Sequence, residues 1–156
     1  MAAASCAELQ SSVRDYHNED MVGQIAPELR GGAWIGGGRT VEASTRYRDW
    51  TLVAFFRPWD SVCIEEVPRL AALHEQYSGR GLSVVGVTEA PLERAQRFVE
   101  SYAVPYPVIT DARETEILFG VEMLWGSEVF LVDPGGIVVA NGLRAVERRL
   151  ATELGG

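Results

Sequence analysis

The residue most suited to chemistry in this chain is a cysteine, Cys63, that follows a short apolar run. That run, Thr51–Phe56, has no polar alternation, which predicts a strand buried on both faces of a sheet. Asp60 precedes the cysteine by three residues and is a natural N-cap, because its carboxylate can accept hydrogen bonds from the N–H groups two and three residues on. We therefore expect Cys63 in the first turn of a helix, where the helix dipole favours a thiolate.

Two interpretations of this cysteine remain open. A thiolate at a helix start can act as a nucleophile, whereas a buried free cysteine behaves as a small hydrophobic residue. An ionised Asp60 three residues away would also oppose the thiolate by like-charge repulsion. We favour Asp60 as a structural N-cap over a catalytic base.

Glu66 and His74 are two titratable side chains on the predicted helix that could affect the cysteine. Glu66 lies one turn after Cys63, close enough to influence its ionisation, although an ordinary surface glutamate would have the same spacing. His74 lies eleven residues after Cys63, roughly 16 Å along a helix, so we expect a histidine of the core or its boundary.

The segment TLVAFFRPWDSVCIEEVP resembles the active-site segment of TlpA/ResA-type thiol-disulfide oxidoreductases, F-W-A-T-W-C-P-P-C-R-x-E-x-P. Without a gap, matching or similar positions are Phe55, Phe56, Trp59, Cys63, Glu66 and Pro68. The resemblance implies that Cys63 is the resolving cysteine, that Glu66 tunes thiol acidity and that Trp59 shields the site and contacts partners. The attacking first cysteine is replaced by Asp60.

A second departure from that family lies near the C-terminus. The relatives carry a cis-proline in a pattern like L-P-T-T-F-L-I-D, and the similar stretch here is SEVFLVD, which begins at Ser127. A cis bond before a residue other than proline is costly, so we expect a trans bond at Ser127. By resemblance, the surface around the site would include Trp59, Ser61, Ser127 and Glu128.

The same segment also resembles the F-F-x-P-x-D-x-T-x-V-C run of peroxiredoxins, the AhpC/TSA-type redoxins, if two residues are deleted. That resemblance implies a cysteine thiolate that attacks peroxide and is resolved by another thiol. Asp60 stands where the family needs threonine or serine, and Arg57, Pro58 and Ser61 are only approximate substitutes. Cys6 could resolve Cys63 if the N-terminal arm covered the site, and a Cys6–Cys63 pair could carry out disulfide exchange in the same way.

Size and charge exclude several classes of protein. A chain of 156 residues fits one domain, and a net charge of −8 argues against nucleic acid as a partner. Two cysteines and two histidines show no metal-ligand spacing, and the glycine-rich stretch 30–40 has no phosphate-binding pattern, so we expect neither metal nor cofactor.

No apolar stretch could span a bilayer, so we expect a soluble protein. We expect it to be cytoplasmic as written, or exported or periplasmic if a signal peptide was removed.

The elements that would position the site follow from periodicity and turn residues. We expect an arm or short helix over 1–22 and one domain over 23–156, with strands at 51–56 and 82–87 and helices at 64–77, 91–102, 114–119 and 143–154. Hairpins are predicted at 30–40 and at 129–140, the latter with the turn Asp133-Pro134-Gly135-Gly136.

The resemblance implies an α/β, thioredoxin-like fold with a central mixed sheet flanked by helices and an N-terminal extension. For function, we predict a redoxin-family protein that has lost dithiol-disulfide exchange and acts as a non-catalytic binding or accessory module. Its partner would be a protein or peptide at the former active-site groove. The alternative is a single-cysteine thiol oxidoreductase or peroxidase that uses Cys63.

Overall fold

The structure is a computed structural model that describes residues 21–36, 47–121 and 126–155. The predicted N-terminal arm lies almost entirely outside these residues, and so does Cys6. Within the described part, no helix is long and apolar enough to cross a membrane.

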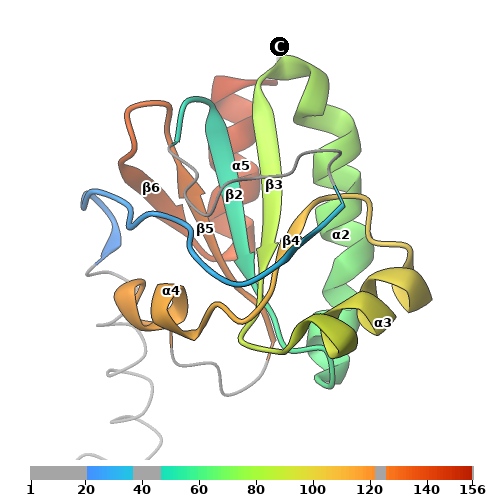
Figure 1. Cartoon of the computed structure of the whole chain (residues 1–156). Helices are drawn as coiled ribbons and strands as arrows, with labels where there is room; N and C mark the ends of the chain where they lie inside the picture. Colours follow the sequence, from blue (N-terminus) through green and yellow to red (C-terminus); the bar gives the residue numbers. More distant parts are fainter. Residues whose placement is uncertain (1–20, 37–46, 122–125, 156) are drawn as a thin grey trace, which may run out of the picture.

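A six-stranded sheet forms the centre of the molecule (Figure 1). The strand order is β1-β4-β3-β2-β5-β6. β2 is parallel to β3 and antiparallel to β5, so the sheet is mixed as predicted. The strands are β1 (Trp34–Ile35), β2 (Trp50–Phe55), β3 (Leu82–Val87), β4 (Val108–Ile109), β5 (Glu128–Val132) and β6 (Val138–Asn141).

Helices cover both faces of this sheet, which explains why the β2 run is apolar throughout. Val53 and Phe55 on β2 pack into one hydrophobic cluster, whereas Leu52 and Ala54 pack into the other, as successive side chains of a strand must. Figure 1 shows α4 in front of the sheet and α5 behind it. The helices are α2 (Ser61–Tyr77), α3 (Leu92–Tyr102), α4 (Arg113–Leu118) and α5 (Leu143–Glu153), with a 3-10 turn, η1 (Ser78–Arg80), after α2.

The two hydrophobic clusters assign the helices to faces. Leu70 and Leu73 of α2 join Val146 and Leu150 of α5 in one cluster. The other cluster contains Phe98 of α3 and residues next to α4, and the first turn of α2 also reaches it. The start of α2 therefore lies at the boundary of the cluster that contains Phe98, beside the end of β2.

The predicted hairpin at 129–140 is confirmed by β5 and β6, which pair in antiparallel fashion. The Asp133 carboxylate fixes their turn, because its Oδ1 accepts hydrogen bonds from the N–H groups of Gly135 at 2.9 Å and Ile137 at 3.0 Å. At the other edge of the sheet, β1 pairs antiparallel with β4, through the register Trp34 to Ile109. The rest of the predicted 30–40 hairpin, from residue 37 on, lies outside the described residues.

Candidate functional site

Asp60 begins the helix that carries the cysteine. Its backbone is extended, with φ −87° and ψ 119°, and its Oδ1 accepts hydrogen bonds from the N–H groups of Val62 at 2.8 Å and Cys63 at 3.3 Å. These two donors would otherwise lack partners at the helix start. The N-cap predicted from the sequence is thus confirmed.

The second oxygen of the same carboxylate reaches a distant segment. Asp60 Oδ2 accepts a hydrogen bond from the Gly126 N–H at 3.0 Å, and Glu66 Oε1 accepts one from the Ser127 N–H at 3.2 Å. The N-cap residue of α2 and one side chain within the helix therefore hold the backbone that leads into β5. Glu66 is half-buried and directed at this segment, so it is not an ordinary surface glutamate.

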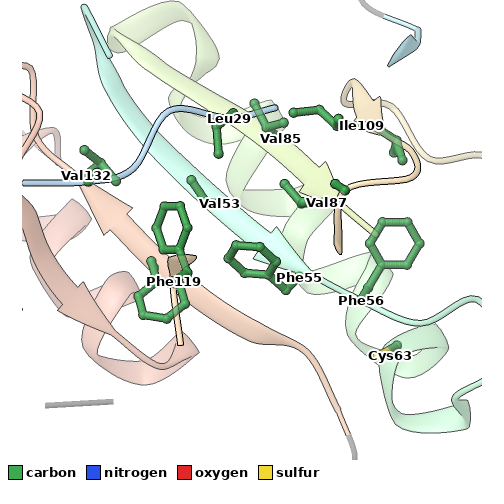
Figure 2. Packing of buried hydrophobic residues seen from close by; sticks show 14 of the residues in the cluster. Leu29, Val53, Phe55, Phe56, Cys63, Val85, Val87, Ile109, Phe119 and Val132 are labelled. Carbon is green, nitrogen blue, oxygen red and sulfur yellow. The ribbon is translucent and has the colours of Figure 1, made fainter. Parts of the chain in front are cut away.

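Cys63 is a buried free thiol with 1% of its surface exposed. Figure 2 shows it at the border of the hydrophobic cluster, below Phe56. Burial is the main effect on its pKa and raises it, while the backbone of Arg57 and the hydroxyl of Ser127 lower it. The negative charges of Asp60 and Glu66 add to the increase, and the net pKa lies above the ordinary value. The pKa of Cys63 is therefore raised, which is the opposite of the change that we expected from the helix dipole.

The residues predicted around the cysteine do not all lie on the surface. Trp59 is 55% exposed and Ser61 is exposed at the first position of α2. Ser127 is half-buried, and its Oγ is buried without a hydrogen bond of normal geometry to the described residues, although it lies close enough to Cys63 to lower the pKa of the thiol. Glu128, expected on the site surface, is instead 6% exposed, because β5 is an interior strand that pairs it with Phe55.

Two further expectations concern His74 and the backbone at Ser127. His74 is half-buried and its ring lies 6.3 Å from that of Tyr106, as expected for a residue at the boundary of the core. Among the described residues no peptide bond is cis, in agreement with the trans bond expected at Ser127. No group of three or more potential metal-ligating side chains occurs in the described part of the chain.

A buried carboxyl group on α4, that of Glu116, was not predicted from the sequence. It is 7% exposed, and its Oε1 is buried with no hydrogen-bond partner in the described part of the chain. The pKa of Glu116 is raised to about 7, mainly by burial and also by the negative charge of Glu89, while Arg57, a hydrogen bond to the Glu89 backbone and Arg113 act to lower it. A six-residue helix is too short to show a clear apolar periodicity, so its inward side could not be predicted.

The family to which this arrangement belongs is decided by a family-model match. The AhpC/TSA family model matches residues 22–141, from the opening extended segment through β6. The chain belongs to the AhpC/TSA family. This match spans Asp60, Cys63, Glu66 and Ser127, and it confirms the predicted redoxin relationship.

Solved structures give the fold. The thioredoxin domain of a thiol-disulfide oxidoreductase from Bacteroides vulgatus has a TM-score of 0.71 at 19% identity, covering 85% of this chain and 97% of that one. A thiol:disulfide interchange protein from Bacteroides sp. has a TM-score of 0.69 at 20% identity, with coverage of 86% and 91%. Mycobacterium tuberculosis AhpC has a TM-score of 0.60 at 19% identity, with coverage of 85% and 94%.

The predicted thioredoxin-like fold is therefore confirmed, since AhpC/TSA-family proteins and thiol-disulfide oxidoreductases both superpose on the described domain. Identities this low establish the fold and no shared activity. A search of curated proteins returned no match.

Proposed function

We propose that this AhpC/TSA-family protein has lost dithiol-disulfide exchange and acts as a binding or accessory module for a protein or peptide partner. The observation that best supports the proposal is the state of Cys63, which is 1% exposed and has a raised thiol pKa. Disulfide exchange starts with the attack of an accessible thiolate on a disulfide sulfur. Neither accessibility nor ready ionisation favours that step here.

The position of Asp60 supports the same proposal. By resemblance to the oxidoreductases, the attacking cysteine would stand at this position, and a carboxylate cannot exchange with a disulfide. Both carboxylate oxygens of Asp60 accept backbone hydrogen bonds, one set in α2 and one at Gly126. The side chain therefore has a structural role that accounts for its presence without catalysis.

One observation favours the alternative, a single-cysteine thiol oxidoreductase or peroxidase. The Arg57 backbone and the Ser127 hydroxyl both lower the pKa of Cys63 and would stabilise a thiolate once it formed. Peroxide is small enough to reach a thiol that a protein disulfide could not reach. We rank this function second because burial still leaves the pKa raised.

The test is the pH dependence of Cys63 alkylation in a Cys6→Ser background. We expect slow labelling in the native protein, because burial disfavours the thiolate. The pH at which the labelling rate is half its maximum should lie above about 8.5, the ordinary pKa of a cysteine thiol. Labelling should become rapid in denaturant, and a Cys6→Ser/Cys63→Ser control should not be labelled. With an added dithiol reductant, the protein should consume peroxide and reduce a protein disulfide no faster than this control does.

The alternative makes the opposite prediction. A midpoint below about 7, together with peroxide turnover that is lost in Cys63→Ser, would favour the single-cysteine enzyme and overturn the proposal. Reduction of a protein disulfide that depends on Cys63 would restore thiol exchange as the activity.

A further inference from the structure

A groove of about 330 Å³ lies beside the site, between the loop after β2 and the outer face of α3. Trp59 forms one wall and is 55% exposed, while Tyr102 at the end of α3 is 42% exposed. Phe98 forms the buried floor. Its ring stacks on Phe56 at 4.9 Å and contacts Tyr102 at 5.0 Å, so the apolar base is anchored in the hydrophobic core.

The groove is also basic. Arg94 and Arg97 line it with no acidic side chain among the lining residues, and the Arg94 guanidinium lies 5.6 Å from the centre of the Trp59 ring. Within the described part of the chain neither arginine forms an ion pair, so both guanidinium groups are available to a ligand. In a chain with 22 acidic and 14 basic residues, two unpaired guanidinium groups on one apolar surface provide a site complementary to carboxylates.

The loop before β5 is a poorer docking edge for a peptide main chain. Asp60 and Glu66 already accept the hydrogen bonds of the Gly126 and Ser127 N–H groups. A strand laid against this loop would find those two donors occupied, and it would have to displace carboxylates from them. The Trp59 side of the site has no such internal competitor among the described residues.

We propose that the groove binds an acidic peptide segment of a partner protein, with carboxylates at Arg94 and Arg97 and an apolar side chain between Trp59 and Tyr102. This inference rests on the proposed binding function and names its partner. Arg94 and Arg97 are three residues apart on α3, so their Cβ atoms lie about 5–6 Å from each other. Alternate residues of an extended peptide lie on one side, about 6.6 Å apart. Two acidic residues with one residue between them therefore match the spacing of the two arginines.

Charge also argues against other anionic ligands. A net charge of −8 repels a nucleic acid or an anionic membrane, whose many charges would meet only two arginines in the groove. A short segment with two carboxylates gains both local contacts and adds little long-range repulsion. The aromatic walls supply the apolar contact that orders such a segment.

The test uses the full chain and a fluorescent eight-residue peptide with two acidic residues one apart, followed by phenylalanine. A second peptide replaces both acids with lysine. We expect only the acidic peptide to bind, more weakly as salt rises from about 50 to 500 mM, because the contacts include exposed charges. Amide chemical shifts should change along α3 and at Trp59.

Two matched double variants locate the contact. Arg94→Glu/Arg97→Glu should weaken acidic-peptide binding by about tenfold or more, since it replaces two attractive contacts with repulsive ones. Arg144→Glu/Arg148→Glu makes the same charge change at exposed positions of α5, which packs on the other cluster of the core, and should leave affinity within about twofold. Trp59→Ala should weaken binding without changing its salt dependence.

Several outcomes would overturn the inference. These are equal binding of the lysine peptide, equal weakening by both double variants, no binding up to about 1 mM, or stronger binding of an oligonucleotide or anionic vesicle than of the peptide. The thiol measurement is independent of all of them. If Cys63 is inert and no peptide binds, only this inference is overturned. If Cys63 turns over, the proposal that the protein has lost thiol exchange is overturned instead.

Discussion

Asp60 connects two separate parts of the local structure through one carboxylate. Oδ1 caps α2, and Oδ2 binds the Gly126 N–H, which lies in a buried backbone segment. One side chain therefore caps α2 and also connects it to the segment before β5. Replacing Asp60 with a neutral or a smaller side chain should therefore separate the contribution of the helix cap from that of the hydrogen bond to Gly126.

We predict that Asp60→Asn destabilises the protein by about 1 kcal/mol and Asp60→Ala by about 2–3 kcal/mol. Asparagine keeps an oxygen to cap the helix, but its amide nitrogen cannot accept the Gly126 hydrogen bond; alanine loses both. Urea unfolding measures the two changes. Glu65→Gln, at an exposed position of the same helix, should change stability little, and equal losses for the two Asp60 variants would contradict the separation of the two roles.

At the scale of elements, the β1 edge depends on a glycine that the sequence pattern could not place. A Cβ on Gly31 would lie 2.5 Å from Ile109 Cγ2 and 2.5 Å from the Thr110 carbonyl oxygen. The neighbouring Gly32 N–H donates to that same carbonyl at 2.7 Å, so the chain must run close to the end of β4. The pairing of β1 with β4 thus requires a residue without a side chain at position 31.

We predict that Gly31→Ala destabilises the protein by about 1–3 kcal/mol, because the clash involves backbone as well as a side chain. Gly79→Ala is the matched control, since a Cβ there meets nothing within 4 Å and its φ is not in the left-handed region. It should be neutral or slightly stabilising. Thermal unfolding distinguishes the two, and a harmless Gly31→Ala would contradict the close approach of the two segments.

At the scale of the whole molecule, the fold gathers ionisable groups from three segments near the site. Arg57 follows β2, Glu89 follows β3, and Arg113 and Glu116 belong to α4. Glu89 pairs with Arg113 at 3.2 Å, whereas the buried Arg57 Nε and Glu116 Oε1 have no hydrogen-bond partner within the described residues. A buried carboxyl group in this setting links folding to pH.

We predict that Glu116 makes the protein less stable as pH rises from about 4.5 to 7. Its pKa is raised from 4.5 to about 7, so in this range the folded state binds more protons than the unfolded state, and stability falls with increasing pH. The total effect is roughly 3 kcal/mol, present below the unfolded pKa and lost above the folded one. Glu116→Gln should therefore be more stable than the parent at pH 8 and similar to it at pH 4.5.

Denaturant titrations at several pH values check this prediction, and comparison with the parent cancels the other carboxylates. Glu114→Gln changes an exposed residue of the same helix and should reproduce the parent's pH dependence. A Glu116→Gln protein whose stability changed with pH as the parent's does would show that another group is responsible.

Three features could be predicted from local sequence: the strand-loop-helix unit around Cys63, the N-cap at Asp60 and the hairpin at 129–140. Each depends on residues within a few positions of one another, through capping, turn geometry or periodicity. The thioredoxin-like class was predicted from the resemblance of the Cys63 segment to a known family. The burial of Cys63, the interior position of Glu128 and the place of Arg94 beside Trp59 are seen in the tertiary structure alone. So are the hydrogen bonds of Asp60 and Glu66 to a segment 66 and 61 residues away. Burial and long-range hydrogen bonds depend on which distant segments the fold brings together, and local sequence does not contain that information.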